Sequence, residues 1–185
     1  MPVAGLISEE EYGTDARSVN ELIERLTTID WYTYAGKIDH AANTKLDQLM
    51  SNLGVKDYEI QWLSKEEVPE AVSRIALEKS ALWDVLKDLP EELKNKIDIN
   101  GNEKLLEDIV DRVPELVFHG AYMQAFHLFG DENAVKYLVG HAMYISILAC
   151  SAELAGEEDI FSPLLELLEM GHLPLGPNGN IFYLL

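Results

Sequence analysis

The sequence has only one cysteine, Cys150, among its 185 residues. A single thiol excludes a disulfide within the chain and any metal cluster held by several thiolates. The N-terminal segment also lacks the basic and long apolar regions of a signal peptide, because a short apolar stretch leads directly into Ser8 and three glutamates. We therefore expect a cytoplasmic protein.

Basic residues are scarce throughout the chain. Lysine and arginine together number 14 against 33 acidic residues, which gives a formal net charge of −19. From residue 114 onward, Lys136 is the only lysine or arginine in the sequence. Affinity for nucleic acids and anionic membranes depends on these cations. We therefore expect neither nucleic acid nor membrane as a partner, and we expect any macromolecular partner to be a basic protein.

Long uncharged segments are also few. The longest extends from Tyr137 to Ala152, which is shorter than the roughly 20 residues that a membrane-spanning helix requires. It contains apolar residues on every side of a helix, so it needs neighbours all round. The segment therefore predicts a buried central helix.

Recurrent helix signals indicate the fold class. Three capping-box patterns begin at Ser18, Ser64 and Asn100, while Pro90 and Pro114 suit the first turns of helices. Glycines at 54, 130, 156 and 171 follow apolar-periodic runs and should end helices. These signals predict helices near 19–28, 31–53, 65–87, 90–97, 102–112, 114–129, 131–155 and 162–170.

The last residues have a different pattern. Asn178 and Gly179 stand between two short apolar runs, which is a β-hairpin signal. A hairpin alone is marginal in water, so it should pack on the helices or on a partner. We predict an all-α bundle of about eight helices with a small C-terminal β-hairpin. We expect residues 1–185 to form a single domain, with a possible subdomain boundary near 94–102.

Motifs for catalysis are missing. The sequence has no Gly-x-Ser-x-Gly turn and no phosphate-binding glycine loop, and none of its five histidines are three or four residues apart. Cys150 lies within the apolar segment, where burial should leave the thiol inert. These features predict no catalytic residue and no cofactor.

Two clusters of carboxylates allow a magnesium site as an alternative. Glu66-Glu67-Val-Pro-Glu70 resembles the first Glu-Glu-x-x-Glu element of the all-α, MazG-like nucleotide pyrophosphohydrolases. Ala81 departs from the second element of that family, where a glutamate would precede Asp84 by three residues. The resemblance implies a Mg²⁺-dependent hydrolase with Glu67 and Glu70 among its ligands.

The second cluster places Asp108 and Asp111 on adjacent turns of one helix face. This spacing resembles the aspartate-rich motif of prenyl-diphosphate enzymes, which implies Mg²⁺ and a phosphorylated substrate. Arg112 and His119, with six residues between them, resemble the Arg-x4-6-His motif of helical HEPN ribonucleases. The negative charge of the chain opposes that activity, because RNA binding needs basic residues.

Three functions remain open from the sequence. The leading hypothesis is a non-enzymatic interaction module that binds a basic protein, as an immunity protein or antitoxin would. The first alternative is a Mg²⁺-dependent hydrolase of phosphorylated small molecules that uses Glu67, Glu70, Asp108 or Asp111. The second alternative is a site for an apolar small ligand beside the central helix. We expect that site to be lined by Phe126, Met143 and Tyr144.

Overall fold

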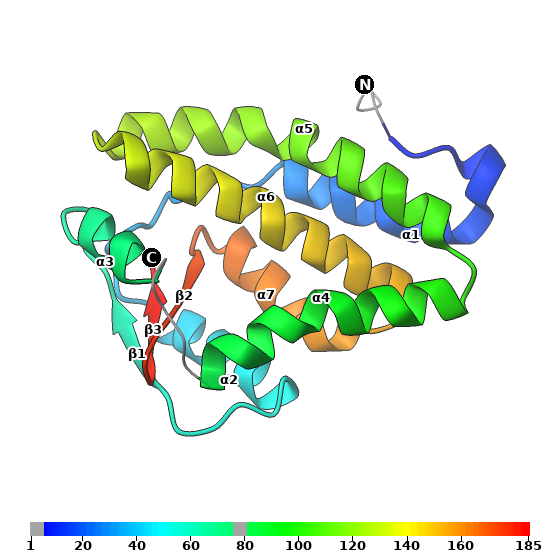
Figure 1. The fold of residues 1–185 in the computed structure, drawn as a ribbon. Coiled ribbons are helices and arrows are strands. Elements are labelled where there is room, and N and C mark those ends of the chain that lie inside the picture. The colour runs from blue at the N-terminus through cyan, green and yellow to red at the C-terminus, as the bar shows by residue number, and fades with distance from the viewer. Residues whose placement is uncertain (1–5, 76–80) are drawn as a thin grey trace.

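The computed structural model describes residues 6–75 and 81–185, and the side chains of residues 81–86 are outside the described set. The described elements are mostly helical and include a small sheet near the C-terminus (Figure 1). The helices are α1 (Glu9–Thr27), α2 (His40–Asn52), α3 (Val68–Ile75), α4 (Ala81–Ile99), α5 (Glu103–Leu128), α6 (Glu132–Ala155) and α7 (Glu158–Glu169). The strands are β1 (Glu59–Trp62), β2 (Pro174–Asn178) and β3 (Ile181–Leu184).

The central position predicted for the apolar segment is confirmed. Helix α6 packs against α1, α3, α4, α5 and α7, and it crosses the middle of the molecule in Figure 1. Its length and composition would suit a membrane span, yet 56% of its apolar window is buried inside the protein. This is the environment of a core helix.

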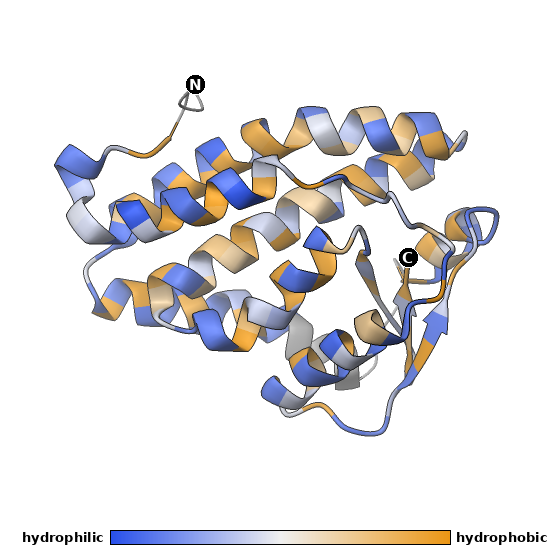
Figure 2. Ribbon diagram, turned by 180° about the vertical axis from the view of Figure 1, so that it is seen from behind, coloured by the Kyte–Doolittle hydropathy of each residue, from blue (hydrophilic) through white to orange (hydrophobic). Residues whose placement is uncertain are grey.

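Helices α1, α2, α3 and α5 bury one face each. Hydrophobic and hydrophilic residues alternate along their turns in Figure 2, as expected of helices that line a core. In α5 the buried stripe includes Ile109, Val113 and Val117. These residues belong to one cluster of buried apolar side chains that also includes the last strand.

Pro90 lies inside α4 and Pro114 lies inside α5, so the helix starts predicted at these two prolines are wrong. The predicted helix 90–97 is part of α4, and the predicted helices 102–112 and 114–129 are both parts of α5. The buried stripe of α5 continues through Pro114, and each large apolar side chain that it buries contributes about 1.5–3 kcal/mol. Several such contributions exceed the roughly 3 kcal/mol that an internal proline costs.

The helix starts predicted from capping boxes are only partly confirmed. Ser18 lies within α1, where its hydroxyl donates to the Asp15 carbonyl oxygen at 3.3 Å. The N-cap of α5 is Asn102, two residues after the predicted Asn100. Glu67 accepts from both the backbone N–H and the hydroxyl of Ser64, each at 2.8 Å. This is half of the predicted capping box, and it precedes α3.

Two further predicted helices have different bounds. The range 31–53 includes a turn segment before α2, because Asp39 caps this helix by accepting from the Ala41 N–H at 2.8 Å. The range 65–87 covers α3 and the beginning of α4, and residues 76–80 between them lie outside the described residues. The four predicted glycine stops are confirmed, since each glycine follows the end of a helix.

The predicted C-terminal hairpin is confirmed and belongs to a three-stranded sheet. Strands β2 and β3 pair antiparallel, and β1 pairs parallel with β3 on the other side. The hairpin packs on the helices of its own chain, where Leu175 and Leu184 are fully buried. Strand β1 was not predicted because it is only four residues long and partly exposed.

Candidate functional site

The carboxylates predicted as magnesium ligands lie on two separate helical regions. Glu67 and Glu70 are at α3, whereas Asp108 and Asp111 are near the beginning of α5, toward the opposite end of the molecule (Figure 1). Within residues 6–75 and 81–185, no group of three or more histidine, cysteine or acidic side chains is arranged to hold a metal ion. The structure therefore does not bring the four predicted ligands together.

Three of these carboxylates have local partners. Hydrogen bonds from Ser64 lower the pKa of Glu67. Glu70 pairs with Arg74 one turn later at 2.5 Å, and Asp108 accepts from the Tyr12 hydroxyl at 2.9 Å. Asp111 is exposed. These are arrangements of a solvated helix surface. Asp84, from the second MazG-like element, has a side chain outside the described residues.

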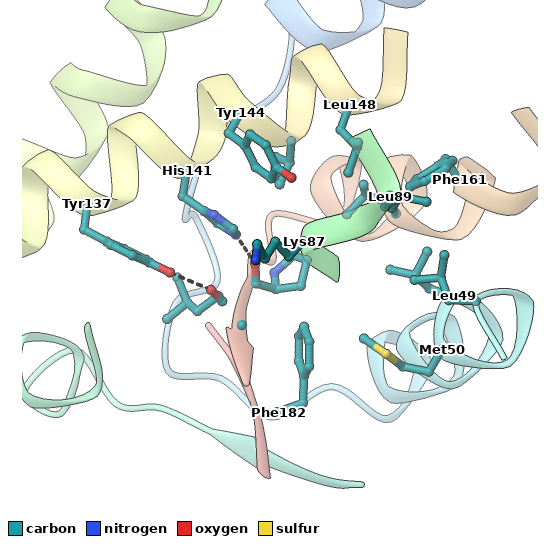
Figure 3. A pocket seen from close by; sticks show the side chains of 16 residues that line it. Leu49, Met50, Lys87, Leu89, Tyr137, His141, Tyr144, Leu148, Phe161 and Phe182 are labelled. Atoms are coloured by element: carbon teal, nitrogen blue, oxygen red, sulfur yellow. Dashed lines mark hydrogen bonds between the residues drawn. The ribbon is translucent and has the colours of Figure 1, made fainter. Parts of the chain in front are cut away.

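A cavity of about 410 Å³ lies beside the central helix, within the size range of small-molecule sites. Figure 3 shows side chains from α6 on one side and from α2, α7 and the C-terminal strands around the rest. The lining is predominantly apolar, as ligand sites usually are. The described lining residues are Leu49, Met50, Leu53, Lys87, Leu89, Tyr137, His141, Tyr144, Ile145, Leu148, Phe161, Leu164, Pro174, Leu175, Gly176 and Phe182.

Three rings on α6 form one wall of the cavity. Tyr137, His141 and Tyr144 are four and three residues apart, which places them on one helix face. The ring centroids of Tyr137 and His141 are 5.6 Å apart, and those of His141 and Tyr144 are 6.2 Å apart. Stacking therefore orients the three rings of this wall.

Two hydrogen bonds attach the hairpin to this wall. The Tyr137 hydroxyl donates to the Leu175 carbonyl oxygen at 2.8 Å, and Nε2 of His141 lies 2.6 Å from the Pro174 carbonyl oxygen. The register between β2 and β3 is irregular from Pro174 to Gly176, so Leu175 has no paired residue across the ladder. The side chains on α6 thus compensate for the interrupted pairing and hold β2 at the edge of the cavity.

His141 is neutral in this position. A carbonyl oxygen can only accept, so Nε2 carries the proton and Nδ1 is left as an acceptor. Burial lowers the pKa of His141, and the hydrogen bond to Pro174 only partly opposes this effect. Burial also raises the pKa of Tyr137 to about 12 and raises that of Tyr144. Of the described lining residues, Lys87 alone carries a charge at neutral pH.

The lowered pKa of His141 predicts a stability loss in mild acid. As the pH falls through about 6.5, the unfolded chain protonates His141 while the folded protein does not. The free energy of unfolding should therefore decrease until the pH reaches the lowered pKa of the folded state. His141→Gln should remove this part of the pH dependence in urea titrations between about pH 5 and 8.

The matched control is His127→Gln, because His127 is exposed on α5. This variant should keep the pH dependence of the parent protein. Equal curves for the parent and His141→Gln would contradict the burial of a neutral imidazole in the cavity wall.

The structure has an apolar cavity beside the central helix, where the second alternative from the sequence expected a ligand site, but only one of the three predicted residues lines it. Tyr144 lines the cavity, whereas Met143 and Phe126 are absent from the lining. Met143 directly precedes Tyr144, and consecutive residues of a helix point to different sides of it. Phe126 is 65% exposed on α5. The spacing of Tyr137 and His141 relative to Tyr144 was the signal that could have identified the wall.

Comparisons of the chain with protein-family models, curated proteins and solved structures found no match.

Proposed function

We propose that this protein is a cytoplasmic binding protein for an apolar small molecule that carries one anionic head group. The observation that carries the proposal is the 410 Å³ cavity with its apolar lining. Residues from four helices and the C-terminal hairpin meet there, so the site depends on the complete fold. A straight-chain alkyl carboxylate has the proposed chemistry.

The apolar part of the ligand would contact the deep side chains of the cavity. Met50 is fully buried, and Leu164 and Phe182 are each 3% exposed. These side chains come from α2, α7 and β3. Met50 and Phe182 lie opposite the α6 wall in Figure 3. Each methylene group transferred from water to such surroundings gains about 0.8 kcal/mol.

The hydrogen-bond donors at the cavity indicate the charge of the ligand's head group. Lys87 is exposed and supplies a positive charge, and Tyr144, which is 42% exposed, also lines the cavity with a hydroxyl group. No carboxylate belongs to the described part of the lining. Donors without a competing acid favour an acceptor, and the lysine favours an anion. The overall negative charge matters less here, because salt screens exposed charges beyond about 8 Å at physiological ionic strength.

A chain-length series tests this function. We expect alkyl carboxylates of about six to twelve carbons to displace a fluorescent apolar probe, with affinity rising up to fourfold per methylene until the cavity is full. Calorimetry should give the same order of affinities and a negative heat-capacity change, which marks burial of apolar surface. Affinity that does not depend on chain length, or no saturable binding, would rule out the proposed function.

Lys87→Gln tests the head group separately. Exposed ion pairs contribute about 0.2–1 kcal/mol, so the variant should bind an alkyl carboxylate up to about fivefold more weakly. Its affinity for the alcohol of equal length should not change. Lys65→Gln is the matched control, since Lys65 is also exposed and does not line the cavity. An equal loss for acid and alcohol would show that Lys87 does not contact the head group.

A further inference from the structure

Helix α5 presents large aromatic side chains to solvent. Phe118, Tyr122 and Phe126 are spaced by four residues and are 46%, 38% and 65% exposed. Their rings form a stacked row, with centroids 5.5 Å apart for the first pair and 5.9 Å for the second. We call these three residues the aromatic row.

The arrangement of α5 is the reverse of an ordinary amphipathic helix in this region. Ala121 and Ala125 face the core and are fully buried, whereas the aromatic row faces outward. The larger apolar side chains would normally lie inside, since burying one contributes about 1.5–3 kcal/mol. Their exposure therefore indicates a surface that a partner covers.

Acidic side chains border the aromatic row. Asp111 and Glu115 are exposed on the neighbouring turns of α5. At the other end, Tyr122 and Phe126 line a groove of about 470 Å³ together with Asp131 and Glu132 at the start of α6. The one lysine of this groove, Lys136, pairs with Glu132 at 2.6 Å. The surface thus combines aromatic faces with an excess of negative charge.

We propose that the aromatic row and its acidic border bind an arginine-containing basic segment of another protein. A guanidinium group can stack on a tyrosine or phenylalanine face and pair with a neighbouring carboxylate at the same time. Tyr122 and Asp131 line the same groove and supply a ring and a carboxylate, of which the carboxylate also accepts from the Ala134 N–H at 2.8 Å. The net charge of −19 would accelerate the approach of such a partner and opposes the pairing of two copies of this chain.

The surface is distinct from the ligand cavity, since none of the aromatic row lines the cavity. Docking at α5 would be a second binding function of the same chain. Binding at this surface is tested with the full chain and three synthetic helical peptides of equal apolar content. The charged positions are all arginine in the first peptide, all lysine in the second and all glutamate in the third.

Fluorescence anisotropy should give the highest affinity for the arginine peptide and a lower affinity for the lysine peptide. The glutamate peptide should not bind. Tyr122→Ala combined with Phe126→Ala should weaken binding of the arginine peptide at least about tenfold, as loss of central aromatic contacts does. Glu115→Gln should weaken it about twofold to fivefold and reduce its salt dependence. Ile38→Ala, at a residue 67% exposed elsewhere on the surface, should have no effect.

Several results would overturn the proposal. These are equal binding of the arginine and glutamate peptides, equal binding by the parent and the double alanine variant, or no binding of any peptide. Sedimentation of the parent protein provides a further check. A concentration-dependent dimer that the double variant abolishes would assign this surface to a second copy of the chain instead.

Discussion

Leu148→Trp should abolish ligand binding while the protein remains folded. Leu148 lies on α6, lines the cavity and is 8% exposed. An indole at this position would occupy space that the ligand needs, so we expect at least a tenfold loss of affinity for an alkyl carboxylate. Overpacking should lower the free energy of unfolding by about 1–3 kcal/mol. Displacement titrations and urea unfolding measure the two effects.

Two comparisons make this result specific. Leu106→Trp introduces the same side chain at a partly buried position outside the cavity and should retain binding. Leu148→Ala enlarges the cavity and should shift the preferred alkyl chain to a greater length. Undiminished binding by Leu148→Trp would place the ligand elsewhere on the molecule.

Tyr32→Ala should produce the largest loss of stability. Tyr32 is 1% exposed, its hydroxyl donates to the Leu138 carbonyl oxygen at 3.0 Å, and its ring packs edge-on against Phe129 at 6.1 Å. Removing a large buried aromatic side chain typically costs about 3–5 kcal/mol. The turn before α2 would then lose its connection to the central helix α6.

Tyr32→Phe separates the ring from the hydroxyl. It should cost about 0.5–1.5 kcal/mol, because one buried hydrogen bond is lost while the packing remains and the Leu138 carbonyl keeps its bond within α6. Chemical unfolding of both variants measures the difference. A cost below about 1 kcal/mol for Tyr32→Ala would show that this turn is not part of the cooperative core.

The sequence predicted the features that depend on local patterns. The apolar segment around Leu138 predicted a central helix, and the helix stop at Gly156 was readable because glycine tolerates its left-handed conformation, with a φ of 72°. Asn178 and Gly179 predicted the hairpin turn. In each case neighbouring residues determine the conformation, so no knowledge of distant contacts is needed.

The errors came from features that depend on distant parts of the chain. Pro114 stays inside a helix because the buried stripe of α5 continues past it. Strand β1 forms because β3, more than a hundred residues later, offers a free edge. The cavity likewise combines α2, α4, α6, α7 and the hairpin, and the spacing on α6 identifies only one of its walls.

The most direct test of the account is an NMR measurement of contacts between a bound alkyl carboxylate and the methyl groups of the protein. We predict intermolecular nuclear Overhauser effects from the alkyl chain to Met50, Leu49 and Leu164, whose side chains line the cavity. Contacts confined to the exposed side chains of α5, or none at saturating ligand, would contradict the central claim that this cavity is a binding site.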